Sequence, residues 1–248
     1  MFKVIEKIKN KSKESFGDSI WEYDSERDKK SFVLEWFRKL PKNSRVLEAG
    51  CGTVNYVVSL TKIGHNTIGI EIDYERVKIA KDYMKKYKIN PRNIVIGDLT
   101  KLPFKNNEFD AIFCHGVVEH IKDSEAAVRE MARVLKSGGY AMISVPNRCT
   151  SFTLSKLVLQ LIDKISGTKL WNVGYEKSFS QWKFKKMLSK YLKILEFRRR
   201  EVQLGTTFPL YGKILRTIDK PLWIIGIGGG WLYAWCQKTE NKNKQKIK

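Results

Sequence analysis

The amino-acid sequence predicts a doubly wound α/β fold built on a mostly parallel sheet. Between residues 44 and 147, short apolar runs recur that enter glycine or acidic turns, as strands buried on both faces do. The segments between these runs carry apolar residues at helical spacing, for example Ala127, Met131, Val134 and Leu135. Alternating strands and helices imply right-handed crossovers, which place helices on both faces of one sheet.

The elements follow in a regular order. Strands are expected at residues 44–50, 66–73, 92–99, 109–116 and 140–147. Helices are expected between them, at residues 55–64, 74–87 and 123–139. The last of these helices is expected to end on Gly138 and Gly139, because glycine is common just past a helix end.

Length and composition describe one large domain. The chain has 248 residues and a net charge of +21. Its four cysteines lie far apart and form no CxxC pair, which argues against a disulfide framework or zinc knuckle and favours a reducing, cytoplasmic setting. No secretion signal is recognisable at the N-terminus. The charge favours an anionic partner, nucleic acid or a membrane surface. A lysine-rich composition from an AT-rich genome explains the charge equally well.

Polar residues and glycines gather where the expected strands end. In doubly wound sheets, ligands bind beyond the carboxyl ends of the strands. A carboxylate ending the second strand suits the two hydroxyls of a ribose. A diphosphate is disfavoured, because Asn55 replaces the third glycine of the GxGxxG motif and the carboxylate of Glu48 would repel the phosphates. The turn therefore suits a ligand that carries positive charge. The residues are, strand by strand, Glu48, Gly50 and Gly52, then Glu71, Asp98 and His115.

These motifs resemble the class I S-adenosylmethionine-dependent methyltransferases, in the branch of small-molecule and quinone methylating enzymes. The resemblance covers about residues 41–147. The family's acid-x-Gly-x-Gly-x-Gly motif is matched up to its third glycine, where Val54 stands. The blocks LTKLPFKNNEFDAIFCHGVVEHI and LKSGGYAMISVPN match the family in the same order. The resemblance implies a Rossmann-like, seven-stranded sheet, with GGWLYAWCQK as its antiparallel last strand.

The resemblance also implies roles for individual residues, with S-adenosyl-L-methionine as cofactor. Glu71 is the ribose ligand, Ile72 lines the adenine slot, and Asp98 with the Leu99 amide clamps the adenine. Val54 is expected to pack in the first turn of the helix, although it could instead narrow the pocket around the methionine moiety. The turn that holds the methionine moiety comprises Glu48, Gly50, Cys51 and Gly52.

The stretch CHGVVEHI contains the residues that are candidates for catalysis and for metal binding. His115 is the candidate general base, or else a residue that only lines the pocket. Quinone O-methyltransferases of the resembling branch can bind a divalent metal through Glu-x-x-Glu-His. Here Gly116 replaces the first Glu, so no metal site is expected. The implied mechanism is direct in-line displacement, in which an oxygen or nitrogen of a small or lipid-like acceptor attacks the methyl group. The alternatives are an RNA or protein methyltransferase and a catalytically inactive binding protein.

Four regions are expected along the chain. Residues 1–40 form an N-terminal helical lid, with Trp21 and Tyr23 as lid candidates. Residues 41–147 form the cofactor-binding core. Residues 148–238 supply substrate cap segments and the closing helix and strands, and residues 239–248 form a basic disordered tail.

Two of the later segments suggest contact with a membrane. Residues 152–165 are amphipathic, and residues 208–223 mix aromatic side chains with lysines. We expect peripheral contact with an anionic membrane surface there, with burial as the roof of the substrate pocket as the competing interpretation. Residues 221–237 are uncharged, but their glycines argue against a membrane span.

Overall fold

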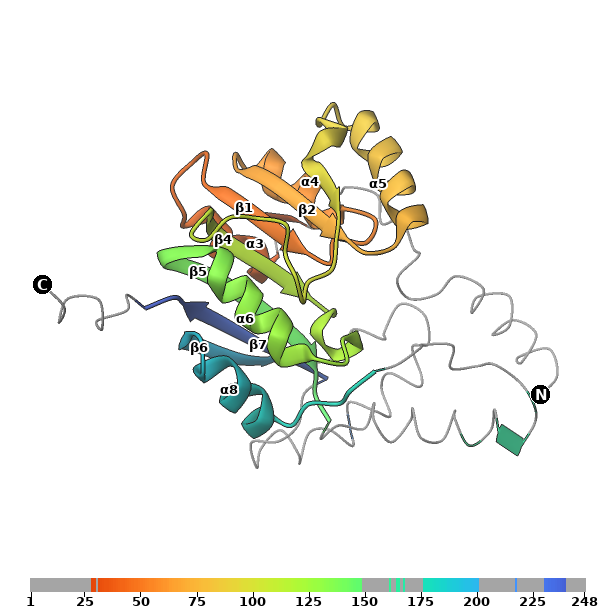
Figure 1. The fold of residues 1–248 in the computed structure, drawn as a ribbon, viewed down its shortest axis with the longest axis vertical. Coiled ribbons are helices and arrows are strands. Elements are labelled where there is room, and N and C mark those ends of the chain that lie inside the picture. The colour runs from red at the N-terminus through yellow and green to blue at the C-terminus, as the bar shows by residue number, and fades with distance from the viewer. Residues whose placement is uncertain are drawn as a thin grey trace, which may run out of the picture.

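The computed structural model describes residues 28–29, 31–148, 161, 164–165, 167, 176–200, 217 and 230–239. Within them, seven strands form one sheet in the order β3-β2-β1-β4-β5-β7-β6 (Figure 1). Strand β7 runs antiparallel to both neighbours, and the pairings among β1 to β5 are parallel. The predicted fold is confirmed. The strands are β1 (Arg45–Ala49), β2 (Asn66–Glu71), β3 (Ile94–Ile96), β4 (Phe109–His115), β5 (Leu135–Pro146), β6 (Lys193–Arg200) and β7 (Trp231–Gln237).

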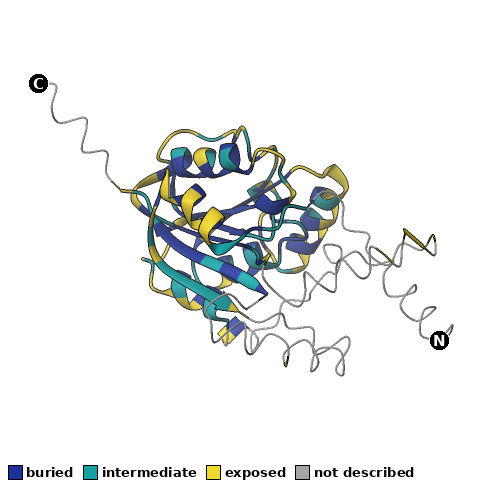
Figure 2. Ribbon diagram, turned by 90° about the horizontal axis from the view of Figure 1, so that it is seen from below, coloured by how far each residue is buried: buried dark blue, intermediate teal, exposed yellow. Residues whose placement is uncertain are grey.

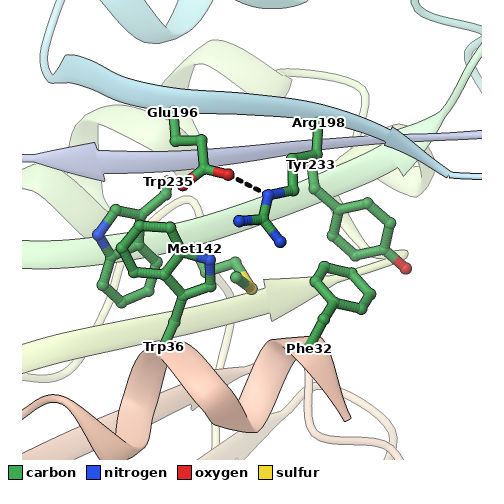
Figure 3. Close-up of a pocket in the computed structure, with 7 residues that line it drawn as sticks. All are labelled: Phe32, Trp36, Met142, Glu196, Arg198, Tyr233 and Trp235. Atoms are coloured by element: carbon green, nitrogen blue, oxygen red, sulfur yellow. Dashed lines mark hydrogen bonds and ion pairs between the residues drawn. The ribbon is translucent and has the colours of Figure 1, made fainter. Parts of the chain in front are cut away.

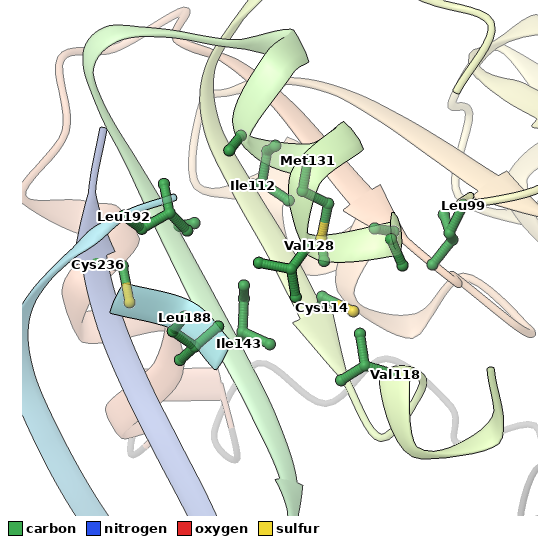
Figure 4. Close-up of a cluster of buried hydrophobic side chains, with 14 of the residues drawn as sticks. Leu99, Ile112, Cys114, Val118, Val128, Met131, Ile143, Leu188, Leu192 and Cys236 are labelled. Atoms are coloured by element: carbon green, nitrogen blue, oxygen red, sulfur yellow. The ribbon is translucent and has the colours of Figure 1, made fainter. Parts of the chain in front are cut away.

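Helices cover both faces of the sheet. Apolar side chains of α3 (Phe32–Arg38), α4 (Asn55–Lys62) and α5 (Tyr74–Lys86) pack on one face. Those of α6 (Ser124–Val134) and α8 (Gln181–Ser189) pack on the other, around the core cluster in Figure 4. Figure 2 shows the buried strands between helices whose outer faces are exposed. Two short 3-10 helices complete the described elements, η1 (Pro91–Asn93) and η2 (Val118–His120).

Helix α6 ends earlier than the sequence predicts. It stops at Val134, and Leu135 already has an extended backbone and begins β5. The apolar periodicity continues through Leu135, but this side chain is buried by pairing with Phe109 of β4 rather than by a further helical turn. The ammonium of Lys238 donates a hydrogen bond to the Leu135 carbonyl at 2.6 Å. The expected stop at Gly138 and Gly139 is therefore wrong, because tertiary pairing ends the helix first.

Several expectations concern residues that lie outside the described part of the chain. These are Trp21 and Tyr23, most of the two segments expected at a membrane, and all but the first residue of the C-terminal tail. Of the expected N-terminal lid, the described residues form chiefly α3, which packs on the sheet. Among the described residues, no helix is long and apolar enough to cross a membrane. Residues 231–237 of the uncharged segment form strand β7.

Candidate functional site

The turn after β1 is built by residues with left-handed backbone conformations. Gly50 has a φ of 77° and Gly52 a φ of 49°, values that favour glycine. The backbone N–H groups of Gly50 and Cys51 both donate to the carbonyl of Ile70, at 2.9 and 3.0 Å, and so tie the turn to β2. A β-carbon on Gly50 would lie 2.5 Å from a methyl group of Val117, whereas one on Gly52 would meet no atom within 4 Å. The turn therefore faces open space at Gly52.

Val54, where the third glycine would stand, keeps a left-handed backbone. Its φ is 64°, which is strained for a β-branched residue and costs about 1–3 kcal/mol. The side chain is fully buried in a cluster with Val57 of α4 and Val77 of α5. The packing expected from the sequence is confirmed. Burial of the side chain offsets the strain that a glycine would avoid.

Glu71 is fixed at the end of β2 by backbone amides. Its Oε1 accepts hydrogen bonds from the N–H groups of Ile72 and Asp73 at 2.9 and 3.1 Å. Its Oε2 accepts from Gly52 at 2.9 Å, which joins the acid to the glycine turn. A carboxylate has about four acceptor directions, so roughly one remains for a ligand. Glu71 is thus a preorganised acceptor beside the turn.

Glu48 is buried at the same edge of the sheet. Among the described residues, no hydrogen-bond donor reaches its Oε2. Burial raises the pKa of Glu48 well above its usual range, the backbone N–H of Val57 offsets part of this rise, and the charge of Glu71 adds to it. A buried acceptor without a donor is costly. The position therefore suits a ligand that brings a positively charged donor.

The ends of β2 and β3 carry exposed apolar side chains, and an exposed acid follows β3. Ile72, directly after β2, is 67% exposed. Ile96, which is the pairing partner of Glu71 on β3, is 48% exposed. Leu99 is buried, whereas Asp98 is exposed and accepts from the N–H of Thr100 at 2.8 Å. Sequence reasoning missed Ile96, although its place as the last residue of an apolar run could have indicated it.

His115 ends β4 within a group of aromatic rings. Its Nδ1 lies 2.5 Å from the hydroxyl oxygen of Ser144 on β5. The imidazole lies 4.6 Å from the ring of Trp231 and 5.7 Å from that of Tyr233, both on β7, and 6.3 Å from that of Tyr56 on α4. Burial lowers the pKa of His115 to about 4, so the ring is neutral at pH 7. Sequence reasoning missed these four neighbours, which long-range pairing brings together.

Glu119 is a further buried acid, on the 3-10 helix η2 after β4. Only 1% of it is exposed, and no donor from the part of the chain that the structure describes reaches its Oε2. Burial raises the pKa of Glu119 to about 8, and the charge of Glu176 adds to this effect. Oε1 lies 4.0 Å from Nε2 of His120, which is largely exposed. Among the described residues, no three potential metal ligands come together.

A hollow lies on the α3 face, and Tyr233 belongs both to its lining and to the rings around His115. Phe32 and Trp36 of α3 close it from one side, and Figure 3 shows Arg198 reaching between the aromatic side chains. The guanidinium of Arg198 pairs with Glu196 and lies 5.8 Å from the Trp36 ring. These contacts hold α3 against the sheet. The other residues that line this shallow hollow are Met142, Tyr233 and Trp235.

Comparison with known proteins assigns a family to the segment that contains these strand ends. The family described as "Methyltransferase domain" matches residues 47–143, which include the glycine turn and both acidic strand ends. Residues 47–143 form a class I S-adenosylmethionine-dependent methyltransferase domain. Glu48, Glu71, Asp98 and His115 all lie inside this methyltransferase domain.

Relatives of known sequence match mainly this methyltransferase domain. An uncharacterized methyltransferase of Schizosaccharomyces pombe is 36% identical over 118 residues, which cover 44% of this chain and 41% of the relative. A demethylmenaquinone methyltransferase of Staphylococcus saprophyticus is 33% identical over 97 residues, which cover 39% and 42% of the two chains. The chain thus spans less than half the length of these relatives.

A solved structure extends the likeness beyond the methyltransferase domain. Phosphoethanolamine N-methyltransferase 2 of Haemonchus contortus, solved in complex with S-adenosyl-L-methionine, superimposes with a TM-score of 0.61. It shares 16% sequence identity over 87% of this chain and 53% of its own. At this identity, the likeness shows the fold alone.

Proposed function

We propose that this protein transfers a methyl group from S-adenosyl-L-methionine to an oxygen or nitrogen of a small or lipid-like acceptor. The cofactor supplies an electrophilic methyl group bound to a sulfonium. A lone pair of the acceptor attacks the methyl carbon in line, while the electron pair of the breaking carbon–sulfur bond stays on sulfur. Positioning contributes most of such a rate enhancement, about 7–11 kcal/mol for well-oriented reactants.

The strand ends of the methyltransferase domain fit this cofactor. The unsatisfied Oε2 of Glu48 is the observation that carries the proposal, because it needs a donor that the ammonium group of the methionine moiety provides. Gly52 leaves the backbone open to close approach, and Glu71 keeps an acceptor direction for a ribose hydroxyl. Ile72 and Ile96 give a flat adenine ring two apolar contacts.

The surroundings of His115 bear on the acceptor. Aromatic rings of Trp231, Tyr233 and Tyr56 surround the imidazole, which suits an acceptor with an apolar or planar body. In the tautomer in which Nδ1–H donates to the Ser144 hydroxyl, Nε2 is unprotonated and can accept a proton or a hydrogen bond from the acceptor. His115 is therefore proposed as the base or as the group that orients the acceptor hydroxyl or amine.

Titration calorimetry with S-adenosyl-L-methionine tests the cofactor assignment. We expect Glu71→Ala to weaken binding by about 1.5–3 kcal/mol, or about ten- to a hundredfold. Glu108→Gln is a matched control, because this acid pairs with Arg45 at the opposite end of the strands. Absence of binding to the unaltered protein would overturn the proposal, and unchanged affinity of a folded Glu71→Ala variant would remove Glu71 from the site.

Methyl transfer from the labelled cofactor then tests turnover. Acceptors that range from phenols and amines to isoprenoid quinones separate a small acceptor from a lipid-like one. Cofactor binding without transfer to any acceptor would favour an inactive binding protein. Transfer to RNA, with an affinity that falls steeply with salt, would favour the nucleic-acid alternative.

A further inference from the structure

Helix α8 presents a cationic face with an exposed tryptophan. Its apolar side chains turn inward and pack in the core on the sheet, whereas Trp182 is 66% exposed. Lys183, Lys185 and Lys186 are also exposed, and the helix contains no acidic residue. Trp182 and these three lysines are called the α8 face below.

The lysines of the α8 face have aromatic rather than acidic neighbours. The ammonium of Lys186 lies 4.8 Å from the Trp182 ring, and that of Lys185 lies 4.3 Å from the Phe197 ring. In the described part of the chain, no carboxylate forms an ion pair with any of the three lysines. The next lysine, Lys190, does pair with an acid, Glu125, at 2.7 Å. Positive charge on the α8 face is therefore uncompensated.

Helix α5 shows that lysine-rich composition alone does not produce such a face. It also carries exposed lysines, but acids are interleaved with them. Lys85 pairs with Asp82 at 2.9 Å, and Arg76 lies 3.9 Å from Asp73 at the helix start. Both helices would share a bias of the genome toward lysine. The absence of acids and the exposed tryptophan distinguish α8 from α5.

Exposed aliphatic side chains in another segment indicate the chemistry of the partner. Leu161 and Ile165 are 58% and 79% exposed, and Lys164 is exposed too. Aliphatic side chains can enter the boundary between lipid headgroups and acyl chains, whereas single-stranded RNA offers bases that stack on aromatic rings. Lysines combined with aliphatic and tryptophan side chains thus favour a lipid surface.

We propose that the α8 face docks the protein on an anionic membrane surface. Lysine ammonium groups would lie near lipid phosphates, and the Trp182 indole would enter the headgroup layer, where its apolar ring and polar N–H both find partners. Such contact is peripheral and reversible, because a few lysines and one ring hold far less tightly than a membrane-spanning helix. This surface lies outside residues 47–143 and does not depend on the reaction of the methyltransferase domain.

Co-sedimentation of the full chain with vesicles tests the docking surface. We expect binding to phosphatidylglycerol-containing vesicles but not to pure phosphatidylcholine vesicles, and release by salt. The triple variant K183Q/K185Q/K186Q should lower the partition coefficient about a hundredfold, which corresponds to about 3 kcal/mol. Trp182→Ala should weaken binding to anionic vesicles at the same net charge.

Two further variants separate local docking from total charge and from misfolding. K78Q/K85Q/K86Q on α5 removes the same charge from exposed positions and should retain most of the binding. K183R/K185R/K186R keeps the charge on α8 and should bind as the unaltered protein does. Equal loss in the α5 variant would overturn the proposal, as would a lack of binding to anionic vesicles at low salt. Binding to single-stranded RNA but not to vesicles would overturn it in favour of a nucleic-acid surface.

Discussion

The imidazole of His115 and the hydroxyl of Ser144 lie 2.5 Å apart on neighbouring strands. Their Cα atoms are direct partners in the parallel register of β4 and β5, so the sheet itself sets this contact. The contact occupies Nδ1 and holds the ring within its aromatic surroundings. It leaves Nε2 as the nitrogen available to an acceptor.

We therefore expect the contact to matter for turnover rather than for cofactor binding. His115→Ala should lower kcat with little change in cofactor affinity, and for an ionisable hydroxyl acceptor the loss should shrink at high pH. Ser144→Ala should cause a smaller loss, about tenfold, because the ring stays but loses its orienting bond. Equal loss at every pH would make His115 a positioning residue.

The low pKa of His115 also predicts a pH dependence of stability. The unfolded chain takes up this proton near pH 6.5 and the folded protein only near pH 4. The contribution of the neutral imidazole to the free energy of unfolding is complete above about pH 6.5. It is lost as the pH falls toward 4, by about 3 kcal/mol. Chemical denaturation of His115→Asn should show a shallower decline over this interval. A parallel decline would contradict the burial of a neutral imidazole.

Glu48 predicts proton release when the cofactor binds. Burial raises the pKa of the free carboxyl, and a nearby ammonium group would lower it again by stabilising the charged form. Calorimetry in buffers of different ionisation enthalpy should therefore detect proton release, and cofactor affinity should rise with pH. Glu48→Gln should abolish the release. Proton uptake, or release that is unchanged in this variant, would place the ammonium group elsewhere.

The left-handed backbone at Val54 predicts an unusual order of stability among variants at this position. At most positions alanine is more favourable than glycine, because it restricts the unfolded chain. At a φ of 64°, the order should reverse, since a left-handed backbone costs a residue with a β-carbon about 1–2 kcal/mol. Val54→Gly should therefore be more stable than Val54→Ala by about 1 kcal/mol in urea denaturation. The opposite order would show that the turn adopts a right-handed backbone in solution.

The parallel strands could be predicted from the sequence, because apolar runs and the turn residues that follow them are local signals. Glu71 and Asp98 could be predicted at one edge, since parallel strands end together. The α6 boundary could not, because Leu135 satisfies helical periodicity and strand pairing alike. Trp231 and Tyr233 reach His115 only through antiparallel pairing of β5 with β7, far along the chain. Contacts made by distant segments leave no local pattern to read.

Glu119 predicts the opposite pH dependence from His115. Burial raises its pKa from 4.5 to about 8, so the folded protein holds this proton over a range where the unfolded chain has lost it. The contribution of the protonated carboxyl to stability is complete below about pH 4.5 and is lost as the pH rises through 8, by about 5 kcal/mol. Glu119→Gln keeps the shape of the side chain without a titratable proton.

The free energy of unfolding of this variant should thus fall less than that of the unaltered protein between pH 5 and 9. Glu176→Gln provides a second test, because removing the charge that faces Glu119 should lower the pKa of Glu119 and so make the loss of stability between pH 5 and 9 smaller. His120, the other titratable neighbour, is largely exposed, and its replacement by Gln should leave the profile nearly unchanged. If Glu119→Gln follows the profile of the unaltered protein, the carboxyl must be ionised in the folded state. A donor would then have to reach Oε2, and the buried acid would be part of a paired site rather than a neutral group.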